Sequence, residues 1–115
     1  LSNDIFANHP KANLDHANIS STYFYGDNSK SNYSNTNGIR AFFSSGSNAK
    51  FNNAILIDAK FDGNFTNADF TGANLQGANF TSANLFGAKI SEQQLKQASS
   101  VCNAILPDGV KGDCN

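Results

Sequence analysis

Residues 68–90 read ADFTG-ANLQG-ANFTS-ANLFG-AKI, and this stretch decides the fold of the chain. One unit of five residues recurs in it: Ala, then Asn or Asp, then Leu or Phe, then a pair that is mostly small or polar. A period of five fits neither the 3.6-residue turn of a helix nor the two-residue repeat of a strand. It is instead typical of a solenoid, in which each unit buries its apolar side chain only by stacking on its neighbours.

The same unit extends over most of the chain if small slips in register are allowed. We term the Leu or Phe position the centre of a unit, and the residue two positions earlier its inner position. Centres are predicted at residues 9, 14 and 19 and, after a four-residue step, at residues 23, 28, 33, 38, 43 and 48. A break near 48–51 and a second four-residue step at 61–65 lead into the regular stretch. The predicted core stack comprises Leu14, Ile19, Phe43, Phe51, Leu56, Phe61, Phe65, Phe70, Leu75, Phe80, Leu85 and Ile90.

Residues 22–50 have the Ser/Asn-rich composition of a loop, but each inner position predicted there is small. We therefore interpret this part as degenerate repeat. The expected organisation is a single domain over residues 1–115. It comprises a lead-in over 1–6, repeat coils over 7–90 with register breaks near 19–23, 48–51 and 61–65, and a capping segment over 91–115.

The five-residue period ends at Ile90, and the following residues predict a short helix over 92–99. Ser91 and Gln94 have the spacing of a capping box, and Ile90 and Leu95 have that of a hydrophobic staple. Packed on the last coil, such a helix would cover a backbone edge that otherwise invites the addition of further strands.

The A(D/N)LXX pattern resembles that of the pentapeptide-repeat family. The ending, a short helix followed by Cys-Asn-x-x-x-Pro-Asp-Gly and a final Asp-Cys, is similar to the tails of many small cyanobacterial members. The resemblance implies an all-β solenoid, a right-handed quadrilateral β-helix with a short C-terminal capping α-helix. About four coils, stacked at the usual strand spacing of ~4.8 Å, would form a rod roughly 20 Å long.

Cys102 and Cys114 are the only cysteines, and they flank a turn predicted at 107–109. We expect a disulfide because the count is even and both residues lie in one small capping element; the alternative is two reduced thiols in a cytoplasmic protein. A disulfide would indicate an oxidising compartment, so the pair favours the periplasm, the thylakoid lumen or the exterior. The chain starts at Leu1 rather than Met, which fits removal of a targeting peptide.

Composition argues against several functions. The net charge is −1 and only 15% of residues are charged, which does not support nucleic-acid binding. No stretch approaches the ~18–20 apolar residues of a membrane span. His9 and His16 fall at different positions of the unit, and the cysteines lack metal-ligand spacing, so no metal or other cofactor is expected. A rod filled with Phe and Leu leaves no substrate pocket, and the sequence predicts a protein that is not an enzyme.

Four apolar residues are expected to point outward and form a candidate contact patch: Ile39, Phe42, Ile55 and Ile57. A cluster of exposed Ile and Phe on an Asn/Ser-rich surface is typical of a contact site. The alternative is that the break at 48–51 folds a loop over these side chains.

The leading hypothesis is a non-enzymatic scaffold that presents flat faces to an unknown protein partner. A second hypothesis follows from the family resemblance, because some members mimic duplex DNA and bind DNA gyrase; the weak charge argues against it here. A third is an ice-binding face, but Thr66, Thr71 and Thr81 are expected on three different sides. Leu1, Ile5 and Phe6 either cover the first coil or leave that end as a surface for homodimer formation.

Overall fold

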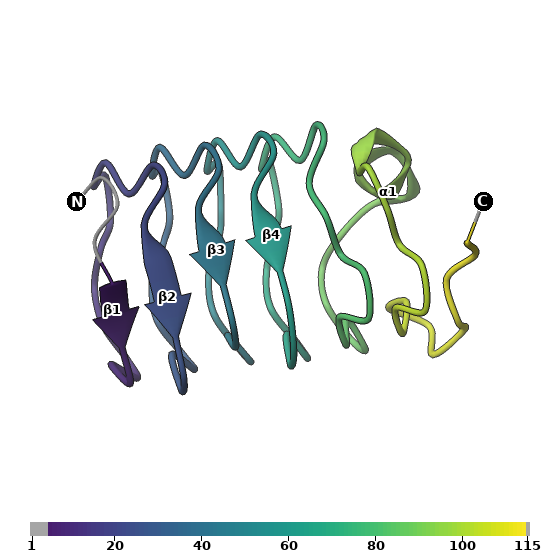
Figure 1. The fold of residues 1–115 in the computed structure, drawn as a ribbon, viewed down its shortest axis with the longest axis horizontal. Helices are drawn as coiled ribbons and strands as arrows, with labels where there is room; N and C mark the ends of the chain where they lie inside the picture. Colours follow the sequence, from purple (N-terminus) through teal and green to yellow (C-terminus); the bar gives the residue numbers. More distant parts are fainter. Residues whose placement is uncertain (1–4, 115) are drawn as a thin grey trace.

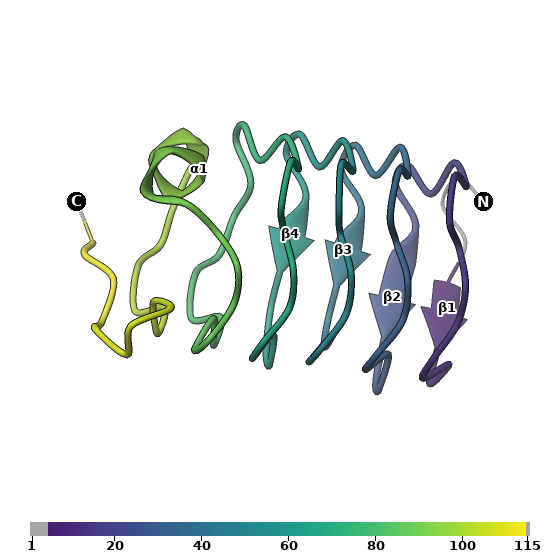
Figure 2. The ribbon, with the colours of Figure 1, turned by 180° about the vertical axis from the view of Figure 1, so that it is seen from behind.

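The computed structural model describes residues 5–114, with side chains from Asn8 onward. Four short parallel strands lie side by side along the long axis of the molecule (Figure 1) in the order β1-β2-β3-β4. They are β1 (Ile5–Ala7), β2 (Tyr23–Tyr25), β3 (Phe42–Phe43) and β4 (Lys60–Phe61). The helix α1 (Glu92–Gln97) lies near the C-terminal end. The arrangement is that of a β-solenoid, because each strand is reached by a full coil of chain that returns to the same side (Figure 2).

Isolated parallel bridges continue the stack beyond β4, from Asn79 to Ser100 and from Asn84 to Ile105. The Cα extents are 33 × 22 × 21 Å, so the molecule is longer than the roughly 20 Å rod expected from about four coils at strand spacing. The sequence prediction stopped the repeat at Ile90 and therefore did not count the coil that α1 and the tail complete.

Each five-residue unit closes one corner of the coil through a β-turn. In the unit centred on Phe70, the Ala73 N–H donates to the Phe70 carbonyl over 2.9 Å. Gly72, two residues after the centre, has a φ of 75°, the value that the third residue of a type II turn requires. A Cβ on Gly72 would also collide with the side-chain oxygen of Asn53 in the neighbouring coil. Gly, or an Asn that tolerates the left-handed region, is therefore favoured at this position.

The Asn or Asp before each centre stabilises the same turn. The Asp69 carboxylate accepts a hydrogen bond of 2.9 Å from the Thr71 N–H, which bridges the centre between them. Asn74 and Asn79 do the same for Gln76 and Thr81. Such Asx hydrogen bonds explain the second letter of the repeat, because a short side chain with an oxygen at that distance is needed.

The core consists of the centres, which stack from coil to coil. Phe51 and Phe70 are stacked with ring centroids 4.8 Å apart, and Phe61 and Phe80 are stacked at 4.7 Å. Fully buried centres also include Ile19, Leu56, Phe65, Leu75 and Leu85. Leu14 and Ile90, near the two ends of the stack, are only partly buried. The small inner residues, mostly Ala, are buried beside the centres and leave room for the large rings.

The register of β2 differs from the sequence prediction. Phe24 is fully buried, whereas Tyr23, the predicted centre, is 37% exposed. The physical reason is the two-residue alternation of the strand, which turns Phe24 inward and Tyr23 and Tyr25 outward. The first short step therefore runs from Phe24 to Asn28 and not across 19–23.

The second register break also differs. The chain runs from Phe43 to a buried Gly46, where the Phe65 ring of the next coil lies 3.1 Å from the place of a missing Cβ. Asn48, the predicted centre, is an exposed corner residue with a φ of 59°. The break expected at 48–51 is thus absent, and a third short step runs from Phe61 to Phe65. All three short steps occur at the same corner, directly after the strand side of the coil.

The beginning of the coil stack lies earlier than predicted, because β1 starts at Ile5 and its Phe6 is in register with Phe24. Residues 1–4, and the side chains of Ile5 and Phe6, lie outside the described part. Two expectations concern these residues: that Leu1, Ile5 and Phe6 cover the first coil, and that this end forms a homodimer. Both therefore remain predictions.

Polar groups within the stack are mostly satisfied. The buried Asn28 donates to the Tyr25 carbonyl and accepts from the His9 N–H. Tyr33 packs between Phe24, Phe43 and Phe51, and its hydroxyl has no hydrogen-bond partner. Burial raises the pKa of Tyr33 well above its ordinary value, so the phenol stays neutral in the core.

Replacement of Phe70 by Ala is expected to lower the free energy of unfolding by about 3–5 kcal/mol, because a fully buried ring in the middle of the stack leaves a cavity. Phe86→Ala is the matched control: this ring is 55% exposed, and we expect a change within about 0.5 kcal/mol. Denaturant unfolding of both variants measures the difference. Equal stabilities would contradict the assignment of Phe70 to the core.

Candidate interaction surface

The outer surface of the solenoid is built from two positions of each unit, the residues before and after the centre. Because coils pair in parallel and in register, these residues form straight rows along the rod. The row before the centre on the strand side contains Tyr23, Phe42, Lys60, Asn79 and Ser100. A continuous binding surface would therefore consist of residues from neighbouring coils in the same row, and not of residues adjacent in the sequence.

The predicted contact patch is divided between two adjoining sides of the rod. Ile39 and Ile57 are neighbours in adjacent coils, since the Arg40 N–H donates to the Ile57 carbonyl over 3.0 Å. Ile55 lies on the same side and is 43% exposed. Phe42 lies around the corner, on the strand side. Ile39, Phe42 and Ile57 are partly buried, so Ile55 is the most accessible member of the set.

An aromatic cluster extends this surface on the strand side. The rings of Tyr23 and Tyr25 lie edge to face with centroids 5.5 Å apart, and those of Tyr23 and Phe42 lie 4.4 Å apart. The Lys60 ammonium is 5.4 Å from the centre of the Phe42 ring, within the range of a cation–π interaction. Tyr25 is 55% exposed.

Sequence reasoning missed this cluster because it placed a repeat centre, an inward position, at Tyr23. The signal that identifies it is the local Tyr-Phe-Tyr alternation, which has the period of a strand rather than of the repeat.

Charges do not gather into a row of one sign. On the side next to α1, the row before the centre reads Asn13, Asn32, Lys50, Asp69 and Lys89. Lys89 and Asp69 form an exposed ion pair with a separation of 4.0 Å. Partial burial opposes ionisation of Asp69, but hydrogen bonds from Thr71 and Asn52 and the charge of Lys89 together lower the pKa of Asp69. This alternation lacks the acidic rows that a DNA mimic needs.

The side chains considered as metal ligands or as ice-binding groups do not lie together. His16 is an exposed corner residue 3.1 Å from the Asp15 carboxylate, and His9 is exposed in the first coil. Within residues 5–114, no three His, Cys, Asp or Glu side chains lie close enough to hold a metal ion. Thr66, Thr71 and Thr81 follow three different centres and lie on three sides. Over the same described range, α1 is far too short and polar to cross a membrane.

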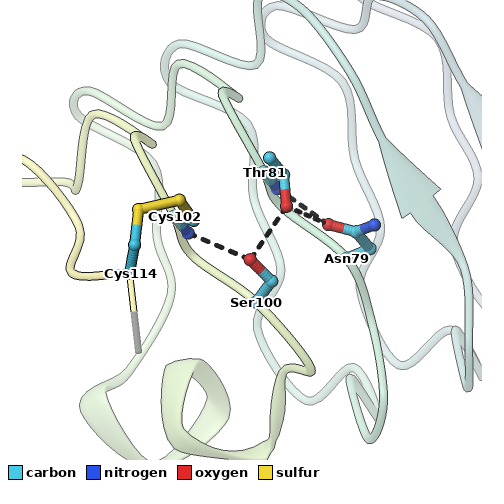
Figure 3. The surroundings of a disulfide bond; sticks show 5 residues. All are labelled: Asn79, Thr81, Ser100, Cys102 and Cys114. Carbon is cyan, nitrogen blue, oxygen red and sulfur yellow. Dashed lines mark hydrogen bonds between the residues drawn. A yellow bond between two sulfur atoms is a disulfide. The ribbon is translucent and has the colours of Figure 1, made fainter.

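Cys102 and Cys114 form a disulfide that ties the tail to the last coil. Figure 3 shows how its surroundings connect to the solenoid: the Cys102 N–H donates to Ser100 Oγ over 3.1 Å, and the Ser100 and Thr81 hydroxyls lie 2.8 Å apart. Thr81 is in turn bonded to Asn79. Ser100 thus plays the part that Asn or Asp plays in the regular units.

The helix α1 covers one side of the last regular coil. It begins with a capping box, in which Ser91 Oγ accepts from the Gln94 N–H and Gln94 Oε1 accepts from the Ser91 N–H. The Gln94 amide nitrogen also donates to the carbonyls of Phe70 and Ala73, over 2.8 and 3.0 Å. One side chain therefore satisfies two backbone oxygens at the edge of the coil.

Removal of the Gln94 amide by Gln94→Ala is expected to lower the free energy of unfolding by about 1–3 kcal/mol, because the partly buried Ala73 carbonyl loses its donor and the Phe70 carbonyl keeps only the Ala73 N–H. The exposed neighbour Gln93 provides the control, since Gln93→Ala changes helix propensity in the same way without touching the coil. Thermal unfolding of the two variants compares them. Equal effects would show that the two carbonyls do not depend on Gln94.

A comparison with protein-family models agrees with the repeat architecture. Eight copies of the pentapeptide-repeat family model match residues 64–99. No curated protein matches the chain. Among solved structures, the chain is similar to HetL, a pentapeptide repeat protein involved in heterocyst differentiation regulation from the cyanobacterium Nostoc sp. strain PCC 7120. The identity is 24% and the TM-score 0.36, with 92% of this chain and 53% of HetL covered, so the chain spans about half of HetL.

At that TM-score the likeness to HetL does not define the fold, which rests on the coil geometry. The repeat match confirms the recognition made from the A(D/N)LXX pattern and implies a right-handed β-helix. Residues 64–99 of the chain consist of pentapeptide repeats.

Proposed function

We propose that this protein is a non-enzymatic scaffold that binds a partner protein through the aromatic and aliphatic surface around β2 and β3. The observation that carries the proposal is the contact cluster of Tyr23, Tyr25 and Phe42, continued around one corner by Ile57 and Ile55. Two of these side chains, Tyr25 and Ile55, are among the most exposed large apolar residues in residues 8–114.

The residue types support a protein partner. Tyr is enriched in the centres of protein interfaces because it provides a large apolar area and a hydroxyl for hydrogen bonding. Arg40 and Asp58 lie at the corner between the two halves of the surface, and their opposite charges suit the polar rim of an interface. A coil stack held by backbone hydrogen bonds presents these groups in fixed positions, which reduces the entropy lost on binding.

The cysteine pair supports a proposal for the compartment of this protein. We propose an extracytoplasmic compartment, such as the periplasm, the thylakoid lumen or the exterior. The support for this is the Cys102–Cys114 bond, because disulfides persist mainly in oxidising environments.

The binding proposal is tested by affinity capture from an extract of the source organism with the immobilised protein, quantified by mass spectrometry. Tyr23→Ser/Tyr25→Ser is expected to reduce recovery of a specifically retained protein by about 30-fold or more, as for interface hot spots. Phe86→Ser, on another side of the rod, provides a control with the same 55% exposure as Tyr25. Recovery that is equal for both variants, or absent for the parent, would reject this surface.

The compartment is tested separately by alkylation and mass spectrometry of protein isolated under acid quench from its native source. We expect both cysteines to be protected from alkylation unless a reductant is added. Free thiols in freshly isolated protein would place it in a reducing compartment.

A further inference from the structure

The last five described residues, 110–114, form a segment that we call the strap. The bridge between Ile105 and Lys111 is antiparallel, whereas the other isolated bridges within the described part of the solenoid are parallel. The strap is therefore not another coil. It folds back across the edge at which a further coil would pair.

The preceding coil shows which hydrogen bonds the edge of a coil normally makes with the next coil. There, the Ser82 N–H donates to the Cys102 carbonyl and the Ala83 carbonyl accepts from the Ile105 N–H, both over 2.9 Å. Two separate residues of the next coil make these two bonds.

At the last coil the equivalent groups are the Asn103 N–H and the Ala104 carbonyl, and both are bonded to Gly112. The Asn103 N–H donates to the Gly112 carbonyl over 3.3 Å, and the Gly112 N–H donates to the Ala104 carbonyl over 2.8 Å. One strap residue thus makes both of the hydrogen bonds that a further coil would make with two residues. Only Gly fits there, because a Cβ would collide with the Val101 carbonyl.

The other hydrogen bonds of the strap lie at its start, where the Leu106 N–H donates to the Val110 carbonyl over 2.8 Å and the Val110 N–H donates to the Asp108 carboxylate over 3.0 Å. Gly112 is buried, but Val110 is 57% exposed, and Lys111, Asp113 and Cys114 are exposed as well. With so few buried apolar contacts, the strap belongs to the part of a protein that opens locally at low cost. The Cys102–Cys114 bond supplies the remaining constraint.

We propose that this disulfide is a redox latch on the C-terminal β-edge, and that its release allows two copies of the chain to exchange straps. A dithiol reductant donates two electrons and two protons: the S–S bond breaks, Cys102 and Cys114 become thiols, and the reductant forms its own disulfide. The strap then swings about the turn at 106–109 and exposes residues 103–105. The strap of a second copy fits this edge because the hydrogen bonds that it would make are those already seen within one copy.

The opening step is tested by native-state hydrogen exchange of the full chain with and without dithiothreitol. Reduction is expected to accelerate exchange of the Asn103 and Gly112 amides by about a hundredfold, the loop-closure effect of a short disulfide loop. The Phe61 amide, which is bonded to the Asn79 carbonyl inside the stack, provides the internal control and should not change.

Cys102→Ser/Cys114→Ser should reproduce the reduced pattern and show no further response to dithiothreitol. Unchanged exchange at Asn103 and Gly112 would overturn the latch. An equal acceleration at Phe61 would also overturn it, because the disulfide would then stabilise the whole domain.

The exchange step is tested by mixing two differently tagged copies, reducing them at high concentration, and re-oxidising with oxidised glutathione. We expect a covalent heterodimer on a non-reducing gel, with Cys102 of one copy linked to Cys114 of the other by peptide mapping. Re-formation of monomers alone, or dimers linked through Cys114 on both copies, would overturn the exchange of straps.

Discussion

The structure depends on one constraint, the corner at which the backbone adopts a positive φ two residues after nearly every centre. Asn53, Asp58 and Asn67 adopt it at about 60°, and Gly takes the same place elsewhere. In the regular units each corner is closed by a turn hydrogen bond from the inner Ala of the next unit, and where Asn or Asp precedes the centre an Asx hydrogen bond supports the same corner. Once the corner is fixed, the centre must point inward, the inner residue must be small, and the next coil meets the first in register.

Backbone pairing between coils then determines the surface. Each side of the rod carries two parallel rows, and their chemistry is set by the residues on either side of the centre. Asn is used so often before the centre because its oxygen serves the turn, which leaves a surface that is polar but weakly charged. Against this background the Tyr23–Tyr25–Phe42 cluster and Ile55 stand out, since none of them contributes a side-chain oxygen to a turn.

The regular part of the fold could be predicted from the sequence because residues 68–90 repeat the five-residue unit without a change of register. Counting four units ahead reaches the stacks of Phe51 on Phe70 and of Phe61 on Phe80 once the four-residue step at 61–65 is included. The middle could not be predicted by counting, because Tyr23 and Phe24 are adjacent aromatic residues that could each be the centre and because Gly46 has no large apolar side chain. The same error affected the predicted contact surface. Counting repeat units identified Ile39, Phe42, Ile55 and Ile57 as outward residues. Tyr23 and Tyr25 could be identified only by recognising that residues 23–25 form a strand.

The steps of fewer than five residues between centres affect where the chain can tolerate insertions and deletions. The corner after the strand side is crossed from Phe24 to Asn28, from Phe43 to Gly46, from Phe61 to Phe65 and from Phe80 to Leu85, so it closes with different numbers of residues in different coils. The other three corners keep the five-residue unit through most of the stack. Length variation is thus confined to one longitudinal seam of the rod. Residues gained or lost in this seam leave the stacked rings in place, which makes it the natural entry point for insertions during divergence and for grafting a foreign loop.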